Sequence, residues 1–194
     1  MVRILIEEME DYAKENKIPI MLPDGICFLE NYIKEHHIKK ILELGTAIGY
    51  SAIRMALVSK DIQIVTIERD QERYQKAIKN IKQANLQEQI QVFNQDIMDF
   101  QTEEQFDLIF IDAAKSQYVR FFEKFSSNLI SGGVIISDNL NFHGYTKQEA
   151  RIESKNLRQM VGKIRNYIEF LKENKEFKTI FIELGDGIGI SEKL

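Results

Sequence analysis

The 194-residue sequence contains one cysteine, two prolines, three histidines and no tryptophan. The single cysteine, Cys27, cannot form an internal disulfide, and its apolar neighbours predict a small buried side chain in a protein of a reducing compartment. No apolar run reaches membrane-spanning length, and acidic residues Glu7, Glu8 and Glu10 interrupt the only apolar stretch near the N-terminus. We therefore expect a soluble, cytoplasmic protein without a signal peptide or a membrane partner.

The chain also lacks an excess of positive charge. It has 26 Lys and Arg against 30 Asp and Glu, which gives a formal net charge of -4. This balance argues against indiscriminate affinity for nucleic acid, although an acidic protein can still carry a local basic face. With 44% hydrophobic residues the chain can bury one sizeable core, but it is too short for two ordinary domains. We predict a single domain over residues 1–194.

Strand and helix patterns alternate along most of the chain. Two helical patterns come first, at residues 4–16 and 23–36, the second with Pro23 in its first turn. Five apolar runs typical of strands follow, at residues 39–44, 62–68, 90–94, 106–112 and 134–138. Further helical patterns cover residues 50–57, 71–85, 118–128 and 149–174. Such alternation indicates a largely parallel sheet covered by helices.

The C-terminal end follows another pattern. Two apolar runs, at residues 179–184 and 188–191, are joined by Gly185-Asp186-Gly187, and Asp-Gly between apolar runs predicts a hairpin. We therefore predict an α/β fold of the Rossmann-like class I methyltransferase type, with a seven-stranded, mostly parallel sheet and an antiparallel C-terminal hairpin strand. Residues 1–37 would form a helical N-terminal lid region and residues 38–194 the Rossmann-like core.

A glycine turn follows the first predicted strand, where open α/β sheets bind their ligands. Its glycines, Gly45 and Gly49, allow a close approach of the backbone to a ligand. Ala47 stands where a dinucleotide-binding turn has its middle glycine, so the spacing favours a nucleoside without phosphates. The missing glycine and the terminal hairpin both argue against a nicotinamide-dependent dehydrogenase.

Acidic residues end the first three strands. Glu68 is placed to bind both hydroxyls of a ribose, and Glu43 to meet an amino group of the ligand. Asp96 and Ile97 follow the third strand and could flank an adenine ring. Each acid also has a purely structural alternative, because Glu68 could cap the next helix and Asp96 could begin a turn.

The fourth and fifth strands end in oxygen-rich side chains. Asp112 ends one strand, and Asp138 and Asn139 end the next. Two carboxylates and one amide form a hard ligand set that suits magnesium better than zinc. Lys115, three residues after Asp112, could stabilise an oxyanion or accept a proton from a substrate hydroxyl. Turn formation, helix capping and a solvated lysine are the structural alternatives.

These segments resemble the cation-dependent O-methyltransferase family that includes catechol and caffeoyl-coenzyme A O-methyltransferases. The resemblance covers nearly the whole chain and rests on Glu43-Leu44-Gly45-Thr46, on residues 111–118 and on Asp138-Asn139. It implies S-adenosylmethionine as methyl donor, Mg²⁺ or another divalent cation at Asp112, Asp138 and Asn139, and catalytic roles for Asp112 and Lys115. The cofactor contacts that we predict on this basis are Met21, Glu43, Gly45, Tyr50, Ser51, Glu68, Asp96, Ile97 and Asp112.

Within this family, residues 18–21, 45–56 and 185–187 are similar to the bacterial tRNA 5-hydroxyuridine methyltransferases. The resemblance implies a homodimer that converts 5-hydroxyuridine at the tRNA wobble position to 5-methoxyuridine. A hydroxyl beside the uracil carbonyl offers a metal two neighbouring oxygens, much as a catechol does. A small catechol-like or hydroxylated aromatic acceptor is therefore the alternative, and a noncatalytic nucleoside- or RNA-binding module is the alternative from another class.

The basic residues predicted to contact RNA phosphates are Arg151, Lys155 and Arg158 in the last long helix. Glu149 and Glu153 lie among them, so a solvated helix face of mixed charge is the alternative. The family also carries about one more helix before the segment that starts here near residue 9, which predicts a shortened lid.

Overall fold

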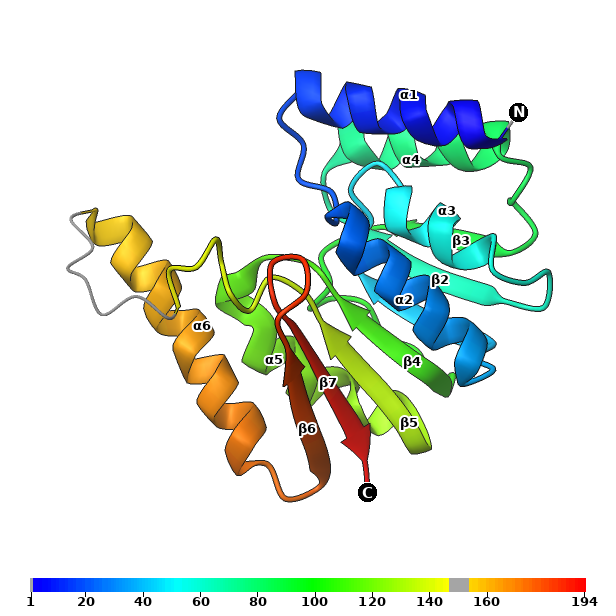
Figure 1. Ribbon diagram of the computed structural model, residues 1–194. Coiled ribbons are helices and arrows are strands. Elements are labelled where there is room, and N and C mark those ends of the chain that lie inside the picture. The colour runs from blue at the N-terminus through cyan, green and yellow to red at the C-terminus, as the bar shows by residue number, and fades with distance from the viewer. Residues whose placement is uncertain (1, 147–153) are drawn as a thin grey trace.

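Seven strands form one sheet in the computed structural model, which describes residues 2–146 and 154–194 (Figure 1). In sequence order they are β1 (Lys40–Leu44), β2 (Gln63–Glu68), β3 (Ile90–Asn94), β4 (Phe106–Ile111), β5 (Leu129–Ser137), β6 (Phe177–Ile182) and β7 (Ile188–Lys193). Their spatial order is β3-β2-β1-β4-β5-β7-β6. Strands β1 to β5 pair in parallel, and β7 pairs antiparallel with both β5 and β6. The predicted mostly parallel sheet with an antiparallel C-terminal strand is confirmed.

Helices cover both faces of the sheet. They are α1 (Val2–Glu15), α2 (Pro23–Glu35), α3 (Tyr50–Ala56), α4 (Gln71–Gln83), α5 (Tyr118–Phe125) and α6 (Lys155–Glu173), with short 3₁₀ turns η1 (Lys115–Gln117) and η2 (Ser126–Asn128). Pro23 lies in the first turn of α2, and the side chain of Asp70 caps α4 by accepting from the Arg73 amide at 2.9 Å. Among the described residues, none of the helices combines the length and the hydropathy of a membrane span.

Alternate residues of the central strands supply two hydrophobic cores. Ile41 and Leu108 belong to the core that α1 to α4 cover, whereas Leu42 and Ile109 belong to the core beneath α5 and α6. All four side chains are fully buried. Burial on both faces is what parallel strands require, because helices cover the sheet on each side. The carboxyl ends of these strands therefore emerge together at one edge, between the two helical layers.

The first helix shares a core with the sheet. Leu5, Met9 and Ala13 lie four residues apart on one stripe of α1 and are buried in the same core as Ile41. Helix α1 lies alongside α4, where the ammonium of Lys76 sits 3.8 Å from the centre of the Tyr12 ring (Figure 1). The N-terminal segment is thus packed against the sheet domain through both apolar and cation–π contacts.

Several predicted boundaries differ from the structure, most of them by one to three residues and those of β5 and α6 by more. Strand β5 begins at Leu129, not at residue 134, because the segment that holds Gly132 and Gly133 continues the strand through a register shift opposite Phe106. Gly132 takes φ +72°, which interrupts the regular alternation of side chains between the two faces of the sheet. The apolar pattern in the sequence therefore identified only the second half of this strand, from residue 134. Helix α6 begins at Lys155, with Ser154 as its extended N-cap, and not at residue 149 as predicted; residues 149–153 lie outside the described residues.

The prediction that Cys27 is buried is wrong, because its side chain is exposed. The buried face of α2 consists of Gly25, Ile26, Leu29 and Ile33. Cys27 follows Ile26 by one residue, a rotation of about 100° around the helix axis, which turns it outward. Apolar neighbours in sequence do not share a face of a helix, so local apolarity was a poor guide here.

We predict that Gly187→Ala lowers the free energy of unfolding by about 2–4 kcal/mol. Gly187 takes φ +84°, and a Cβ there would lie 2.7 Å from the backbone nitrogen of Asn141, so both backbone strain and a clash would result. Gly132→Ala is the matched control, because Gly132 has φ +72° with no atom within 4 Å of an added Cβ, and should cost only about 1–2 kcal/mol. Urea denaturation followed by circular dichroism measures both; equal losses would contradict the expected clash.

Candidate functional site

A cavity of about 460 Å³ opens at the carboxyl ends of β1, β2 and β4, a size typical of small-molecule sites. Most of the predicted site residues line its wall, namely Met21, Gly45, Tyr50, Ser51, Glu68, Asp96, Ile97, Asp112, Lys115 and Asn139. Glu43 and Asp138 are buried and do not line the cavity. The fold therefore brings the predicted cofactor residues and most of the predicted metal residues to one place.

The glycine turn forms the floor of the cavity. The amides of Gly45 and Thr46 both donate to the carbonyl of Ile67 at 3.2 Å, which ties the end of β1 to the end of β2. Gly45 takes φ +106°, and a Cβ there would collide with the carbonyl oxygen of Asp112, so only glycine fits. Ala47 takes φ +47° at the position where a dinucleotide-binding turn has its middle glycine. This close approach of β1 to β4 lets the turn run directly beneath Asp112.

Glu68 links the glycine turn to the next helix. One carboxylate oxygen accepts from the Ala47 amide at 2.8 Å and the other from the Asp70 amide at 2.9 Å. The side-chain cap of α4 is Asp70, so the alternative that Glu68 itself caps this helix is wrong. A carboxylate has about four lone-pair sites, so Glu68 keeps acceptor capacity toward the cavity that it lines.

Asp96 begins a turn and also lines the cavity. One of its oxygens accepts from the Met98 amide at 2.8 Å, and the other lies 3.5 Å from Nη1 of Arg69. The structural alternative is thus correct for Asp96, but it does not exclude a ligand contact, because the turn places Asp96 and Ile97 in the cavity wall. Three arginines also line the cavity at its rim, namely Arg69, Arg73 and Arg120, and none of them was among the predicted site residues.

Glu43 is completely buried behind Ser51. Its carboxylate accepts from the hydroxyl of Ser51 and, at 2.5 Å, from that of Thr66, while Thr66 and Thr46 share a further hydrogen bond at 2.6 Å. Burial raises the pKa of Glu43 to about 7, and the two hydroxyls oppose this shift. Sequence reasoning missed Thr46 and Thr66, although both are polar residues in otherwise apolar strand ends. Since Glu43 does not line the cavity, it would act on a ligand through Ser51.

The predicted metal residues meet where β4 and β5 end. The amide of Asp112 donates to the carbonyl of Leu44, and the amide of Asp138 donates to the carbonyl of Ile111, each at 3.1 Å. Nδ2 of Asn139 donates to Oδ1 of Asp112 at 3.0 Å. Asn139 takes φ +65°, a conformation that asparagine tolerates better than most residues. Backbone pairing of three adjacent strands thus places all three side chains together.

Negative charge accumulates at this point. Burial raises the pKa of both Asp112 and Asp138, and the charge of Asp112 raises that of Asp138 further, while nearby Lys115 lowers both. No site in the described part of the chain gathers three or more His, Cys, Asp or Glu side chains for a metal. Here the third oxygen donor would be the Asn139 amide, after a half-turn that presents its oxygen. Two mutually repelling carboxylates and an amide fit a hard divalent cation.

The turn between β6 and β7 holds the loop that carries Asn139. The amides of Leu140 and Asn141 donate to the carbonyls of Gly187 and Asp186 at 2.9 and 2.7 Å. One oxygen of the buried Asp186 carboxylate accepts from the His143 amide at 2.5 Å, and the other lies 3.6 Å from Nδ1 of His143. Sequence reasoning treated Asp186 only as a hairpin residue. The Gly-Asp-Gly signal was present, but its contact with the loop depends on tertiary structure.

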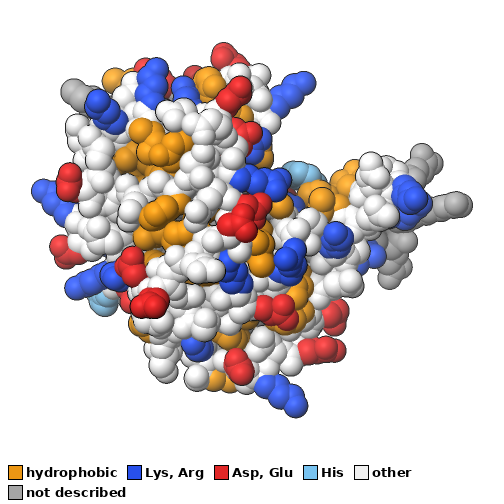
Figure 2. Space-filling model, turned by 180° about the vertical axis from the view of Figure 1, so that it is seen from behind, with side chains coloured by type: hydrophobic (Ala, Val, Ile, Leu, Met, Phe, Trp, Pro, Cys, Tyr) orange, Lys and Arg blue, Asp and Glu red, His pale blue; other side chains and the backbone are white. Residues whose placement is uncertain are grey.

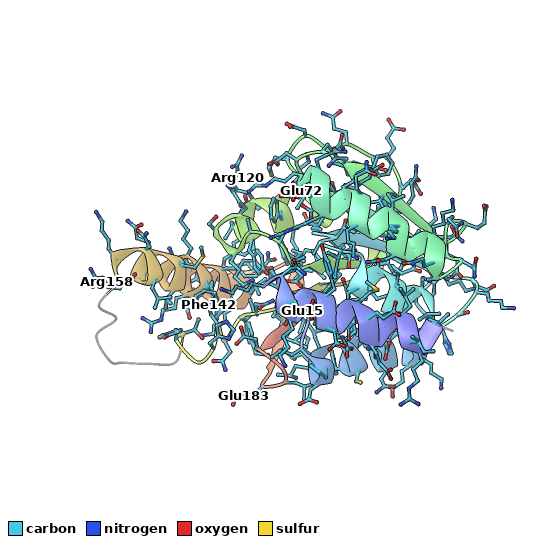
Figure 3. All side chains as sticks on the ribbon, turned by 90° about the horizontal axis from the view of Figure 1, so that it is seen from above. Glu15, Glu72, Arg120, Phe142, Arg158 and Glu183 are labelled. Atoms are coloured by element: carbon cyan, nitrogen blue, oxygen red, sulfur yellow. The ribbon has the colours of Figure 1, made fainter. Side chains whose placement is uncertain are left out.

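Two of the residues predicted to contact RNA, Lys155 and Arg158, lie apart from the cavity. Lys155 and Arg158 are exposed in the first turns of α6 and do not line it, and Arg151 lies outside the described residues. Figure 3 places Arg158 toward the outer end of α6, away from Arg120 on the cavity rim. On the face shown in Figure 2, basic and acidic side chains are interspersed and form no broad patch of one sign. The RNA contacts remain a prediction.

Comparison with known proteins gives a consistent result. A sequence model of the family described as O-methyltransferase matches residues 3–194. A catechol O-methyltransferase from Niastella koreensis is 36% identical over 138 residues, which span 68% of this chain and 62% of the relative. A structure titled "putative caffeoyl-CoA O-methyltransferase", from Staphylococcus aureus, is 34% identical, covers 97% of this chain and 92% of its own, and has a TM-score of 0.93.

A third match concerns the cofactor. An O-methyltransferase from Bacillus cereus, solved in complex with SAH, is 25% identical, with a TM-score of 0.84. The match covers 98% of this chain and 90% of the other.

We predict that Glu43→Gln flattens the pH dependence of stability. The Glu43 carboxyl has a pKa of about 7 in the fold against an ordinary value of 4.5, so between these values the folded chain holds a proton that the unfolded chain has released. The proton on Glu43 contributes to the free energy of unfolding. Its contribution is fully present below the pKa of Glu43 in the unfolded chain and is lost as pH rises through its pKa in the folded chain, a change of roughly 3 kcal/mol. Relative to wild type, the variant should therefore gain free energy of unfolding from about pH 5 to about pH 8.

Urea titrations with a chelator present measure this difference. Glu104→Gln is the control, because Glu104 is an exposed acid paired with Lys40 at 2.9 Å. Parallel pH profiles for wild type and Glu43→Gln would show that Glu43 is ionised in the fold throughout this range.

Proposed function

The chain belongs to the O-methyltransferase family and is an S-adenosylmethionine-dependent enzyme. From this premise we propose that it methylates 5-hydroxyuridine at the wobble position of tRNA. We propose further that the reaction needs a divalent metal. The observation that carries the proposal is the group Asp112, Asp138 and Asn139 beside the cavity, with Lys115 next to it. The product would be 5-methoxyuridine.

Cofactor binding follows from the cavity wall. S-adenosylmethionine supplies an electrophilic methyl group on its sulfonium. Glu68, held by the Ala47 and Asp70 amides, is placed to accept hydrogen bonds from the ribose hydroxyls. Asp96 and Ile97 would flank the adenine, and Ser51, supported by Glu43, would receive the amino-acid end of the cofactor.

The acceptor site would lie beside the strand-end oxygens. Mg²⁺ held by Asp112, Asp138 and Asn139 would lower the pKa of an acceptor hydroxyl and favour an acceptor with two neighbouring oxygens. Lys115 lies in the cavity wall close enough to Asp112 and Asp138 to lower the pKa of both. Its ammonium would stabilise an acceptor oxyanion.

Two features support tRNA as the acceptor. Residues 18–21, 45–56 and 185–187 resemble the tRNA 5-hydroxyuridine enzymes, and the cavity rim carries Arg69, Arg73 and Arg120, which could contact phosphates. Lys155 and Arg158 on α6 could extend these contacts along a nucleic acid, and a homodimer would double the surface. A small catechol is the second candidate, favoured by the 36% identity to the catechol O-methyltransferase of Niastella koreensis.

We predict that Asp138→Asn lowers methyl transfer by more than about a hundredfold and leaves S-adenosylhomocysteine affinity within about threefold, because Asp138 lies outside the cavity wall. Radiolabelled methyl transfer and isothermal titration calorimetry measure the two quantities. Asp61→Asn, an exposed aspartate in the turn before β2, is the matched control and should behave as wild type. Full activity of the wild type in excess chelator would refute the metal requirement.

We predict that the purified protein methylates tRNA containing 5-hydroxyuridine in preference to a panel of catechols, measured with labelled S-adenosylmethionine and Mg²⁺. Replacing Lys155 and Arg158 by alanine together should raise KM for tRNA by about tenfold while kcat changes little, since phosphate contacts position the substrate. Transfer to catechols alone would assign the enzyme to small-molecule substrates, and transfer to neither would contradict both candidates.

A further inference from the structure

A chain of hydrogen bonds joins the first three helices to the cofactor cavity. Tyr50, the first residue of α3, lines the cavity, and its hydroxyl donates to Oε1 of Glu10 in α1 at 2.6 Å. Nη1 of Arg54 donates to the same hydroxyl at 2.9 Å. Nε and Nη2 of Arg54 donate to the two oxygens of Glu30 in α2 at 2.6 and 3.0 Å. A bidentate arginine–carboxylate pair thus holds Arg54, which in turn orients Tyr50.

The segment that follows α1 forms part of the cavity wall. Pro19, Ile20 and Met21 line the cavity, and Met21 is 4% exposed. The amide of Ile18 donates to the carbonyl of Ala13 at 2.9 Å, so the start of this segment is fixed to the end of α1. Any movement of α1 away from the body would therefore move one wall of the cavity.

Helix α1 is an outer element that packs on the rest of the molecule through one stripe of side chains. Its buried side chains are Leu5, Met9 and Ala13, and Tyr12 meets Lys76 of α4. The Glu10–Tyr50 hydrogen bond links it to α3 at the cavity, where Tyr50 is 2% exposed and the Glu10 side chain 42%. A hydrogen bond to a carboxylate is stronger than one between two neutral groups. The donor here is the hydroxyl of Tyr50, whose ring is itself fixed by packing.

We propose that Glu10 is a positioning residue for the cofactor site, which couples the docking of α1 to cofactor retention. By accepting from Tyr50, Glu10 holds α1 against α3 and so fixes the Pro19–Met21 wall. Bound cofactor packs between this wall and Tyr50, and it stabilises the docked helix in return, because coupling between two binding events is reciprocal. The inference rests on the cofactor site of the proposed function, but not on the acceptor or the metal.

The test uses S-adenosylhomocysteine as the probe and the full-length chain. Glu10→Ala should raise the dissociation constant and the dissociation rate of the probe about five- to tenfold, the effect of losing one charge-assisted hydrogen bond that is partly open to solvent. Glu10→Gln retains an acceptor oxygen and should recover most of the affinity. Glu7→Ala is the matched control, because Glu7 lies on the same helix and pairs with exposed Arg3 at 3.1 Å.

A double-variant cycle separates coupling from loss of stability. Tyr50→Phe keeps the ring in the cavity wall but lacks the donor. Glu10→Ala should therefore cost less affinity in the Tyr50→Phe background than in wild type, because only the ion pair of Glu10 with Arg54, at 4.0 Å, is left to lose in that background. Hydrogen exchange in α1 should slow when the probe binds to wild type and slow less in Glu10→Ala. Circular dichroism tests whether each variant is folded. If Glu10→Ala does not fold, the comparison of Glu10→Gln with Tyr50→Phe tests the proposal instead.

Each outcome has one meaning. Wild-type affinity in Glu10→Ala, an equal loss in Glu7→Ala, or additive losses in the double variant would overturn the proposal. Failure of wild type to bind the probe would instead contradict the cofactor site on which the proposed function depends.

Discussion

The concentration of carboxylates at the ends of three adjacent parallel strands is the constraint on which the site depends. The positions of Glu43, Asp112 and Asp138 follow from the pairing of β1, β4 and β5. Glu43 and Asp138 are buried and Asp112 is half-buried, which costs free energy. The fold offsets this cost in different ways. The hydroxyls of Ser51 and Thr66 donate hydrogen bonds to Glu43, whereas the charge of Lys115 and a hydrogen bond with the backbone of Asn139 stabilise the carboxylate of Asp138. At Asp112 and Asp138 these interactions offset only part of the cost of desolvating the carboxylates, and the divalent cation of the proposed function would offset the rest.

Strand ends were predictable because their causes are local. A run of apolar residues that stops at an acid identifies both the strand and the edge where its last side chain emerges, so Glu68, Asp96, Asp112 and Asp138 could be assigned to one site. The alternation of strands and helices and the Asp-Gly hairpin gave the parallel sheet with its antiparallel strand for the same reason.

The contacts that the sequence did not reveal arise between distant segments. The support of Glu43 by Thr66, the fixing of the 140–143 loop by Asp186 and the link from Glu10 to Tyr50 each join residues that only the tertiary fold brings together. No periodicity encodes such pairs. The error at Cys27 has a related origin, because the side of a helix that is buried depends on what packs against it.

The position of β7 has a consequence for the order of synthesis. This strand follows β6 along the chain, yet it pairs between β5 and β6. While the polypeptide leaves the ribosome, one edge of β5 therefore stays unpaired until β7 has emerged, and exposed strand edges favour aggregation. A nascent chain halted before the turn at residues 185–187 would carry both aspartates without Asp186 and Gly187, which hold the loop beside them. The loop beside Asp138 is thus fixed only after residues 186 and 187 have been synthesised, and a chaperone that shields the open edge of β5 would favour the assembly of this part of the fold.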